Sequence, residues 1–96
     1  MNTQRRTLLE HRTTLEPKVV LDAAREFFSR RNTLYAAFIE QDGPTHVSMR
    51  GQGGEELVIA ATPTPDGATL VTGSSYLFDA QISRFFAMLP RAEVPA

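Results

Sequence analysis

Three groups of residues have types that could do chemistry: the glycine-rich residues 51–54 (GQGG), the two histidines and the pair Ser74-Ser75. The glycine-rich residues could cradle a phosphate, because backbone N–H groups bind anions where such a loop leads into a helix. The following residues, "EELVIAAT", are typical of a strand, and neither GxGxxG nor GxxxxGK[ST] occurs in the chain. The pattern therefore favours a hairpin turn over a phosphate loop.

The histidines and serines do not form a known catalytic or metal-binding motif. His11 and His46 belong to no HExxH sequence, no paired spacing and no neighbourhood rich in carboxylates. Ser74-Ser75 lacks the GxSxG sequence that exposes a nucleophilic serine. The chain has no cysteine, which removes disulfides, thiolate ligands and cysteine nucleophiles. We expect no catalytic residue, no metal and no cofactor, and hence a protein that is not an enzyme.

Composition and charge narrow the class of protein further. The 96 residues, 42% hydrophobic and 22% charged, suit one globular domain with a single core. A net charge of −1 gives no overall attraction to nucleic acid or anionic lipid. The apolar runs are too short to span a bilayer, and the polar start "MNTQRRTLLEHR" has no signal-peptide core. We expect a cytoplasmic protein without nucleic-acid binding or membrane insertion.

A first amphipathic helix is expected over residues 17–31. Val20, Ala24 and Phe28 recur at helical spacing in "EPKVVLDAAREFFSRR". Pro17 suits the first turn, where its missing N–H group would have no partner in any case.

A second amphipathic helix is expected in "YLFDAQISRFFAML", which Pro90 ends. Ser75 or Asp79 could cap its N-terminus. Its apolar stripe consists of Phe78, Ile82, Phe85, Phe86 and Leu89.

Between the helices, "NTLYAAFIE" and "THVSMR" are typical of two strands, joined by the four-residue turn 41–44 (QDGP). That loop length places Phe38 opposite Val47 and Ala36 opposite Met49, because opposed residues share one face of an antiparallel pair. The face toward the core then carries Leu34, Ala36, Phe38, Val47 and Met49. On the reverse face the expected pairs are Ile39 with His46, Ala37 with Ser48 and Tyr35 with Arg50.

The glycine-rich residues would form the next turn as a three-residue loop, with Gly54 in the left-handed bulge position. The register that follows pairs Arg50 with Glu56, Met49 with Leu57 and Val47 with Ile59. A loop centred on Gln52 and Gly53 alone would slip the register by one position and oppose Met49 to Glu56, a poorer match.

A last hairpin is expected at "PTPDG", where Pro65, Asp66 and Gly67 have the chemistry of a turn. The strand "ATLVTGSSY" follows, and its mixed alternation leaves the register open. Gly73 either weakens this strand or lets a helix or ligand approach it closely.

These elements predict an α+β domain with an N-terminal helix, a four-stranded antiparallel β-meander and a C-terminal amphipathic helix, both helices on one face of the sheet. Residues 1–14 would be a flexible arm or a short strand, residues 15–90 the single domain and residues 91–96 a tail.

The helix opened by Pro17 in "LEPKVVLDAAREFF", the Asp66-Gly67 turn in "PDGATLVTGSS" and the final amphipathic helix resemble the START and polyketide-cyclase-like helix-grip (SRPBCC) superfamily. In that family a bent antiparallel sheet grips the last helix around an apolar ligand cavity. The chain is shorter than the family's usual domain and lacks two of its central strands. The resemblance therefore transfers no functional residue.

The function that these patterns favour is that of a small interaction module, as a homodimer or as an accessory subunit of a larger assembly. The sheet face opposite the helices would make the contact, because an apolar strip on a surface indicates a binding site. Its residues are Tyr35, Ala37, Ile39, His46, Ser48, Arg50, Val58 and Ala60. The alternative is a helix-grip type carrier that holds a small apolar ligand between the sheet and the C-terminal helix.

Overall fold

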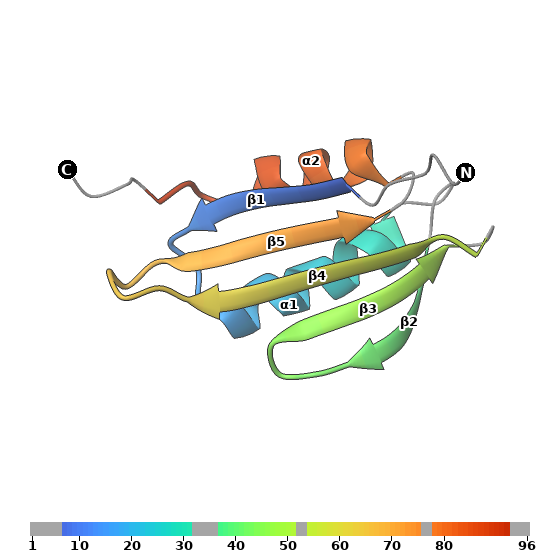
Figure 1. Cartoon of the computed structure of the whole chain (residues 1–96), viewed down its shortest axis with the longest axis horizontal. Helices are drawn as coiled ribbons and strands as arrows, with labels where there is room; N and C mark the ends of the chain where they lie inside the picture. The colour runs from blue at the N-terminus through green and yellow to red at the C-terminus, as the bar shows by residue number, and fades with distance from the viewer. Residues whose placement is uncertain (1–6, 32–36, 52–53, 76–77, 93–96) are drawn as a thin grey trace, which may run out of the picture.

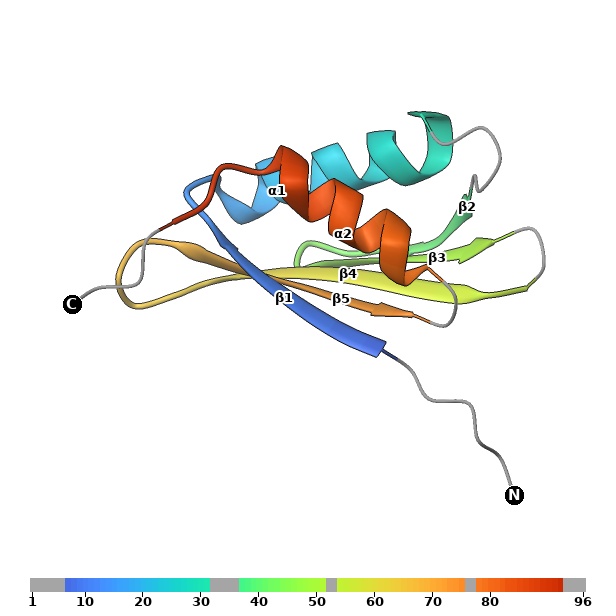
Figure 2. The ribbon, with the colours of Figure 1, turned by 90° about the horizontal axis from the view of Figure 1, so that it is seen from above.

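The computed structural model describes residues 7–31, 37–51, 54–75 and 78–92. The elements follow in the order β1 (Thr7–Thr13), α1 (Pro17–Glu26), the π-helical turn η1 (Phe27–Arg31), β2 (Ala37–Asp42), β3 (His46–Gly51), β4 (Glu56–Pro63), β5 (Thr69–Ser75) and α2 (Asp79–Met88) (Figure 1). The strands form one antiparallel sheet in the order β1-β5-β4-β3-β2. Both helices lie on the same face of this sheet, as Figure 2 shows.

The sheet has five strands, so the prediction of four is wrong. The additional strand is β1, which pairs antiparallel with β5 from Thr7↔Ser75 to Thr13↔Thr69. Residues 7–13 thus form the short strand that was one of the two expectations for this segment. Their partner lies at the other end of the sequence, and such a distant pairing leaves no local turn signal.

The first helix has the predicted extent, but its last five residues form the π-helical turn η1. Pro17 occupies the first turn, and the buried side chains Val20, Leu21 and Ala24 face the sheet. Phe28 in η1 is also fully buried. The 3.6-residue spacing of these apolar positions places them on one side of the helix, which explains why this side packs on the sheet.

The second helix confirms its predicted stripe, because Phe78, Ile82, Phe85, Phe86 and Leu89 are all buried. Gly73 of β5 lies under this helix, and a Cβ atom at position 73 would be 2.6 Å from Cγ2 of Ile82. Gly73 therefore allows the helix to approach closely, which was one of the two predictions for it. The prediction that Ser75 or Asp79 is the N-cap is wrong, because Phe78 occupies that position without a side-chain cap hydrogen bond. Ser75 Oγ accepts a hydrogen bond from the Phe78 N–H at 3.3 Å, just before the helix.

The hairpin between β3 and β4 has the predicted register, with Val47↔Ile59, Met49↔Leu57 and Arg50↔Glu56 paired. Gly54 has φ of +91°, the left-handed backbone that the loop was expected to need. The loop is closed by the Gly51 N–H, which donates to the Glu55 carbonyl at 2.7 Å, and by the Gly54 N–H, which donates to the Gly51 carbonyl at 3.0 Å.

The hairpin between β2 and β3 differs from the prediction. Phe38 pairs with Arg50 and Ile39 with Met49, and a β-bulge between Ile39 and Gln41 changes the register before Gln41↔Ser48 and Asp42↔Val47. The predicted pairs Phe38–Val47, Ile39–His46 and Ala37–Ser48 are therefore wrong, and Ala37 pairs with Gly51. Leu34, Tyr35 and Ala36 lie outside the described residues.

The pairing of β2 with β3 differs from the prediction partly because β2 continues through Gln41 and Asp42, which were expected in the turn. The chain reverses after Asp42, where the Gly43 N–H donates to the His46 carbonyl at 2.9 Å. Asp42 is also held by α1, because Arg25 Nε donates to its Oδ1 at 2.9 Å. The longer β2 places Asp42 opposite Val47 where Phe38 was predicted, and this even shift of four positions keeps the faces unchanged. The one-residue bulge then moves Phe38 to the other face of the sheet, where its side chain is 64% exposed, whereas Ala37 is buried.

The hairpin between β4 and β5 turns at "PTPDG" as predicted. Gly67 has φ of +88°, and its N–H donates to the Thr64 carbonyl at 3.1 Å. The register left open by the sequence is Ile59↔Gly73 and Ala61↔Val71. With these strands in place, the largest fully buried side chains between sheet and helices include Phe28, Phe85, Leu21, Met49, Leu57, Ile59 and Ile82.

Candidate interaction surface

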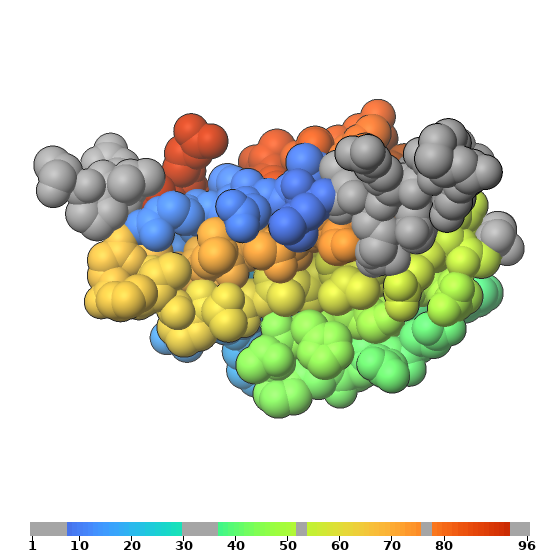
Figure 3. Space-filling view, in the orientation of Figure 1, coloured from blue at the N-terminus to red at the C-terminus, as the bar shows by residue number. Residues whose placement is uncertain are grey.

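The face of the sheet opposite the helices, which we call the open face, is the most extended candidate site. Opposed residues of antiparallel strands share a face, so the registers define rows across it. The two central rows are Leu8, Ser74, Val58 and Ser48, and Glu10, Thr72, Ala60 and His46. Phe38, Arg50 and Glu56 form the row on one side of them, and Arg12, Leu70 and Thr62 form the row on the other. Figure 3 looks onto this face, with β1, β5, β4 and β3 side by side in blue, orange, yellow and green.

Five of the eight predicted contact residues lie on the open face: His46, Ser48, Arg50, Val58 and Ala60. The placement of Ala37 and Ile39 was wrong, because their partners Gly51 and Met49 are on the side of the sheet that the helices cover. Ala37 is buried there, and Ile39 is 41% exposed at the edge strand. Tyr35 lies outside the described residues. That these residues form an interface stays a prediction.

Three large apolar residues of the open face were missed: Leu8, Phe38 and Leu70. Leu8 and Phe38 are 63% and 64% exposed, and Leu70 is half-buried. The exposure of Phe38 on this face could not be predicted from the sequence, because it depends on the bulge in β2. Leu8 lies opposite Ser74, and Leu70 lies opposite Arg12. The alternation in "TLLEHRT", which places Leu8, Glu10 and Arg12 on one face, was the signal available for Leu8.

The middle of the open face carries short side chains. Ser74, Thr72, Val58 and Ala60 are half-buried there. Ser48, in the same row as Val58, is 6% exposed. None of these side chains is long, so the centre of the face is shallow and presents methyl and hydroxyl groups. Longer side chains lie at its margins.

At the β2 margin Arg50 and Glu40 form an ion pair with two hydrogen bonds, from Nε to Oε2 at 2.6 Å and from Nη2 to Oε1 at 3.2 Å. Arg50 also donates from Nη1 to the Gly54 carbonyl at 2.8 Å. The hydrogen bond from Arg50 lowers the pKa of Glu40, and the same contact raises the pKa of Arg50. The pair is exposed, so it fixes the position of a charge at this margin more than it stabilises the fold.

At the β1 margin Arg12 forms an ion pair with Asp66 of the β4–β5 turn. The Thr64 hydroxyl and then Arg12 hydrogen-bond the Asp66 carboxylate, and they lower the pKa of Asp66 to about 2. Asp66 therefore stays ionised to a lower pH than an ordinary aspartate. Both margins of the open face thus present fixed charges of both signs.

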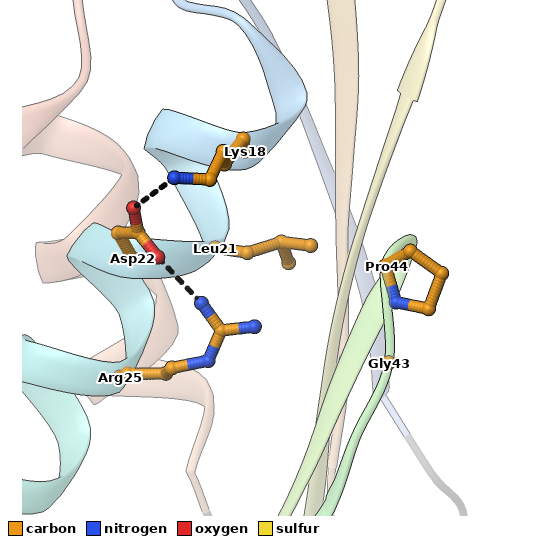
Figure 4. Close-up of a pocket in the computed structure, with 6 residues that line it drawn as sticks. All are labelled: Lys18, Leu21, Asp22, Arg25, Gly43 and Pro44. Carbon is orange, nitrogen blue, oxygen red and sulfur yellow. Dashed lines mark hydrogen bonds and ion pairs between the residues drawn. The ribbon is translucent and has the colours of Figure 1, made fainter.

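A pocket of about 330 Å³ lies between α1 and the β2–β3 loop (Figure 4). Leu21 forms its apolar part, opposite Gly43 and Pro44. Along α1, Asp22 accepts from Arg25 Nη1 at 2.6 Å and lies 3.8 Å from Lys18 Nζ. Because Arg25 also binds Asp42, these charges tie the helix to the end of β2. We assign the cluster a structural role.

A second pocket, of about 370 Å³, lies between β1 and α2. It is lined by His11, Ser83, Phe86, Ala87, Leu89 and Arg91. The His11 ring stacks on Phe86, with centroids 5.4 Å apart and planes 25° apart. Within the described part of the chain, His11 Nε2 is buried and makes no hydrogen bond. This pocket therefore combines an aromatic wall with polar groups.

Two further findings concern the described residues alone. They contain no group of three or more His, Cys, Asp or Glu side chains that could hold a metal ion. Neither of their α-helices is long and apolar enough to cross a membrane.

The side chains expected to contact an apolar ligand under α2 are themselves packed into the core, and the ligand stays a prediction.

The fold defines this chain as a small α+β domain with two helices on one face of a five-stranded antiparallel sheet. Comparison with protein-family models, with curated proteins and with solved structures found no match to it. The resemblance to the helix-grip superfamily stays a prediction.

Proposed function

We propose that the protein is a non-enzymatic binding module that uses its open face to contact a second copy of itself. The observation that carries this proposal is the exposure of Leu8 and Phe38, 63% and 64%, on a sheet face that neither helix covers. Val58 adds apolar surface in the row of Leu8, and Ala60 and Leu70 add it in the two rows beyond. Apolar side chains gathered on one uncovered face favour a protein contact over a purely solvated surface.

The dimensions of the open face suit a protein interface. Five strands spaced about 4.8 Å, with a mean length of about seven residues or roughly 23 Å, give a footprint on the order of 550 Å². A corrugated surface has a larger accessible area than its footprint, and a stable interface buries roughly 800 Å² on each partner. The face is therefore of the right order for one whole interface.

The short central side chains favour a second sheet as the partner. Two sheets that pack face to face lie about 10 Å apart and interdigitate their side chains. Ser74, Thr72, Val58 and Ala60 leave room for such an approach. A two-fold symmetric contact also requires a self-complementary surface, and the presence of both signs of charge at the margins, in Arg50–Glu40 and Arg12–Asp66, supports such a contact.

The test is sedimentation velocity from micromolar to millimolar protein. We expect the wild type to form a dimer, and Val58→Asp to abolish the dimer because it places a charge in the middle of the contact. Val19→Asp is the matched control, since Val19 is 46% exposed in the first turn of α1, away from the open face. It should leave the dimer unchanged.

A wild type that stays monomeric over this range overturns the homodimer. A dimer that Val58→Asp leaves intact overturns the use of the open face. Circular dichroism on both variants verifies that a lost dimer is not a lost fold.

A further inference from the structure

The outer edge of β1 already accepts a backbone partner at one end. The Ala92 N–H donates to the Arg12 carbonyl at 3.0 Å, and Thr13 forms an antiparallel bridge with Arg91. In an antiparallel strand, backbone groups point alternately to the two sides. Because Arg12 directs its carbonyl outward, Glu10 and Leu8 direct their N–H and carbonyl groups to the same outer side.

The pocket between β1 and α2 lies directly beside this edge. His11 points from β1 toward α2, where its ring stacks on Phe86. On α2, Ser83 and Ala87 are one turn apart, exposed and short, so they leave space between helix and strand. The volume of about 370 Å³ is at the lower end of the roughly 300–1,000 Å³ typical of ligand clefts.

We infer that this groove binds an extended segment of a partner protein, which adds to β1 as a further strand and inserts one apolar or aromatic side chain beside Phe86. Main-chain hydrogen bonds to Leu8 and Glu10 would supply affinity, and the pocket would supply selectivity for that side chain. Arg91 at the pocket favours an acidic residue in the segment. A group that hydrogen-bonds His11 Nε2 would also give this buried atom the partner that it lacks among the described residues.

A second copy of the chain fits this edge poorly. Two β1 strands paired antiparallel about Glu10 would place two carboxylates opposite each other, which is destabilising. Ala92 also already occupies the Arg12 carbonyl, which such a pairing would need. The segment is therefore expected to come from another protein.

The other edge strand, β2, is built against strand addition. It contains the bulge between Ile39 and Gln41, and its charged residues Glu40 and Asp42 are held by Arg50 and Arg25. Bulges and charges are the usual protection of a sheet edge. β1 also carries charged residues, Glu10 and Arg12, but it pairs with β5 without a bulge, and on its described outer side Ala92 makes a backbone hydrogen bond at the end of the strand. The straight edge of β1, in contrast to the bulged β2, selects β1 as the binding edge.

In the experiment, a random nine-residue peptide library displayed on phage is selected in parallel on the wild-type protein and on Glu10→Pro. Proline removes the outward N–H of residue 10 without removing a bond to β5. We expect peptides with one apolar or aromatic residue and a nearby acid, whose affinity falls tenfold or more in Glu10→Pro and in Ala87→Trp, which fills the pocket. Glu10→Ala is the matched control and should bind like the wild type.

Two results overturn the inference: no sequence enriched on the wild type over Glu10→Pro, or enriched peptides that bind wild type, Glu10→Pro and Ala87→Trp equally. Amide spectra of each variant establish that it is folded. The inference is independent of the proposed dimer, because Val58→Asp alters the open face and should leave peptide binding unchanged.

Discussion

Ile82 of α2 lies on Gly73 of β5 so closely that a Cβ atom at position 73 would be 2.6 Å from its Cγ2 and 3.2 Å from its Cδ1. Ile82 is fully buried and branched at Cβ, so it has little freedom to move away. The absence of a side chain at Gly73 therefore lets α2 approach β5 closely at this point.

Gly73→Ala should therefore destabilise the protein, although alanine is the better strand residue. Overpacking of a filled core costs about 1–3 kcal/mol, which exceeds the gain of roughly 0.5–1 kcal/mol from replacing a glycine in a strand. Urea unfolding of Gly73→Ala, Ile82→Ala and the double variant measures the coupling. Because Ile82→Ala removes the clashing atom, the double variant should lose less free energy of unfolding than the two single losses added together. Strict additivity would contradict the contact.

Gly54→Val should destabilise the protein through its backbone alone. Gly54 has φ of +91°, and nothing lies within 4 Å of the position that a Cβ would take. The left-handed region costs a non-glycine residue about 1–2 kcal/mol, and a β-branched residue should be at the upper end. Gly54→Asn is the control and should lose less, because asparagine tolerates this region. A Gly54→Val protein of wild-type stability that no longer binds inorganic phosphate would instead favour a phosphate loop.

The predictions that held rest on local signals. Helical spacing located both helices, and the glycine-rich loop fixed the β3–β4 register because one residue of slip would have opposed Met49 to Glu56. The turn at "PTPDG" was equally local, as its Gly67 has φ of +88°.

The predictions that failed depend on contacts distant in sequence. β1 became a strand by pairing with β5, more than fifty residues later. The β2–β3 register was altered by a bulge and by Arg25, which binds Asp42 from the helix layer. No turn motif records a bulge or a helix-to-strand ion pair. For this reason Ala37, Ile39 and Phe38 were assigned to the wrong faces, whereas the residues of β3 and β4 were assigned correctly.

Asp66 should stabilise the fold above about pH 4 and lose that effect as the pH falls toward 2. Hydrogen bonds from Thr64 and Arg12 lower the pKa of Asp66 from 3.8 to about 2. A group whose pKa is lowered by folding adds stability above its unfolded pKa, and the contribution disappears as the pH falls through the folded value. Thermal unfolding of the wild type and Asp66→Asn should differ at neutral pH, and the difference should shrink between pH 4 and pH 2. A difference that stays constant across that window would show that Asp66 acts through turn geometry instead of charge.

Phe28 and Phe38 should respond very differently to truncation, although the sequence placed both in the core. Phe28 is fully buried, and Phe28→Ala should lower the free energy of unfolding by about 3–5 kcal/mol. Phe38 is 64% exposed on the open face, so Phe38→Ala should change the stability of the isolated monomer by no more than about 0.5 kcal/mol. Urea unfolding at low protein concentration measures both. A large loss of unfolding free energy for Phe38→Ala would mean that its ring packs in the core, as the register predicted from the sequence requires. The bulged β2–β3 pairing would then be wrong.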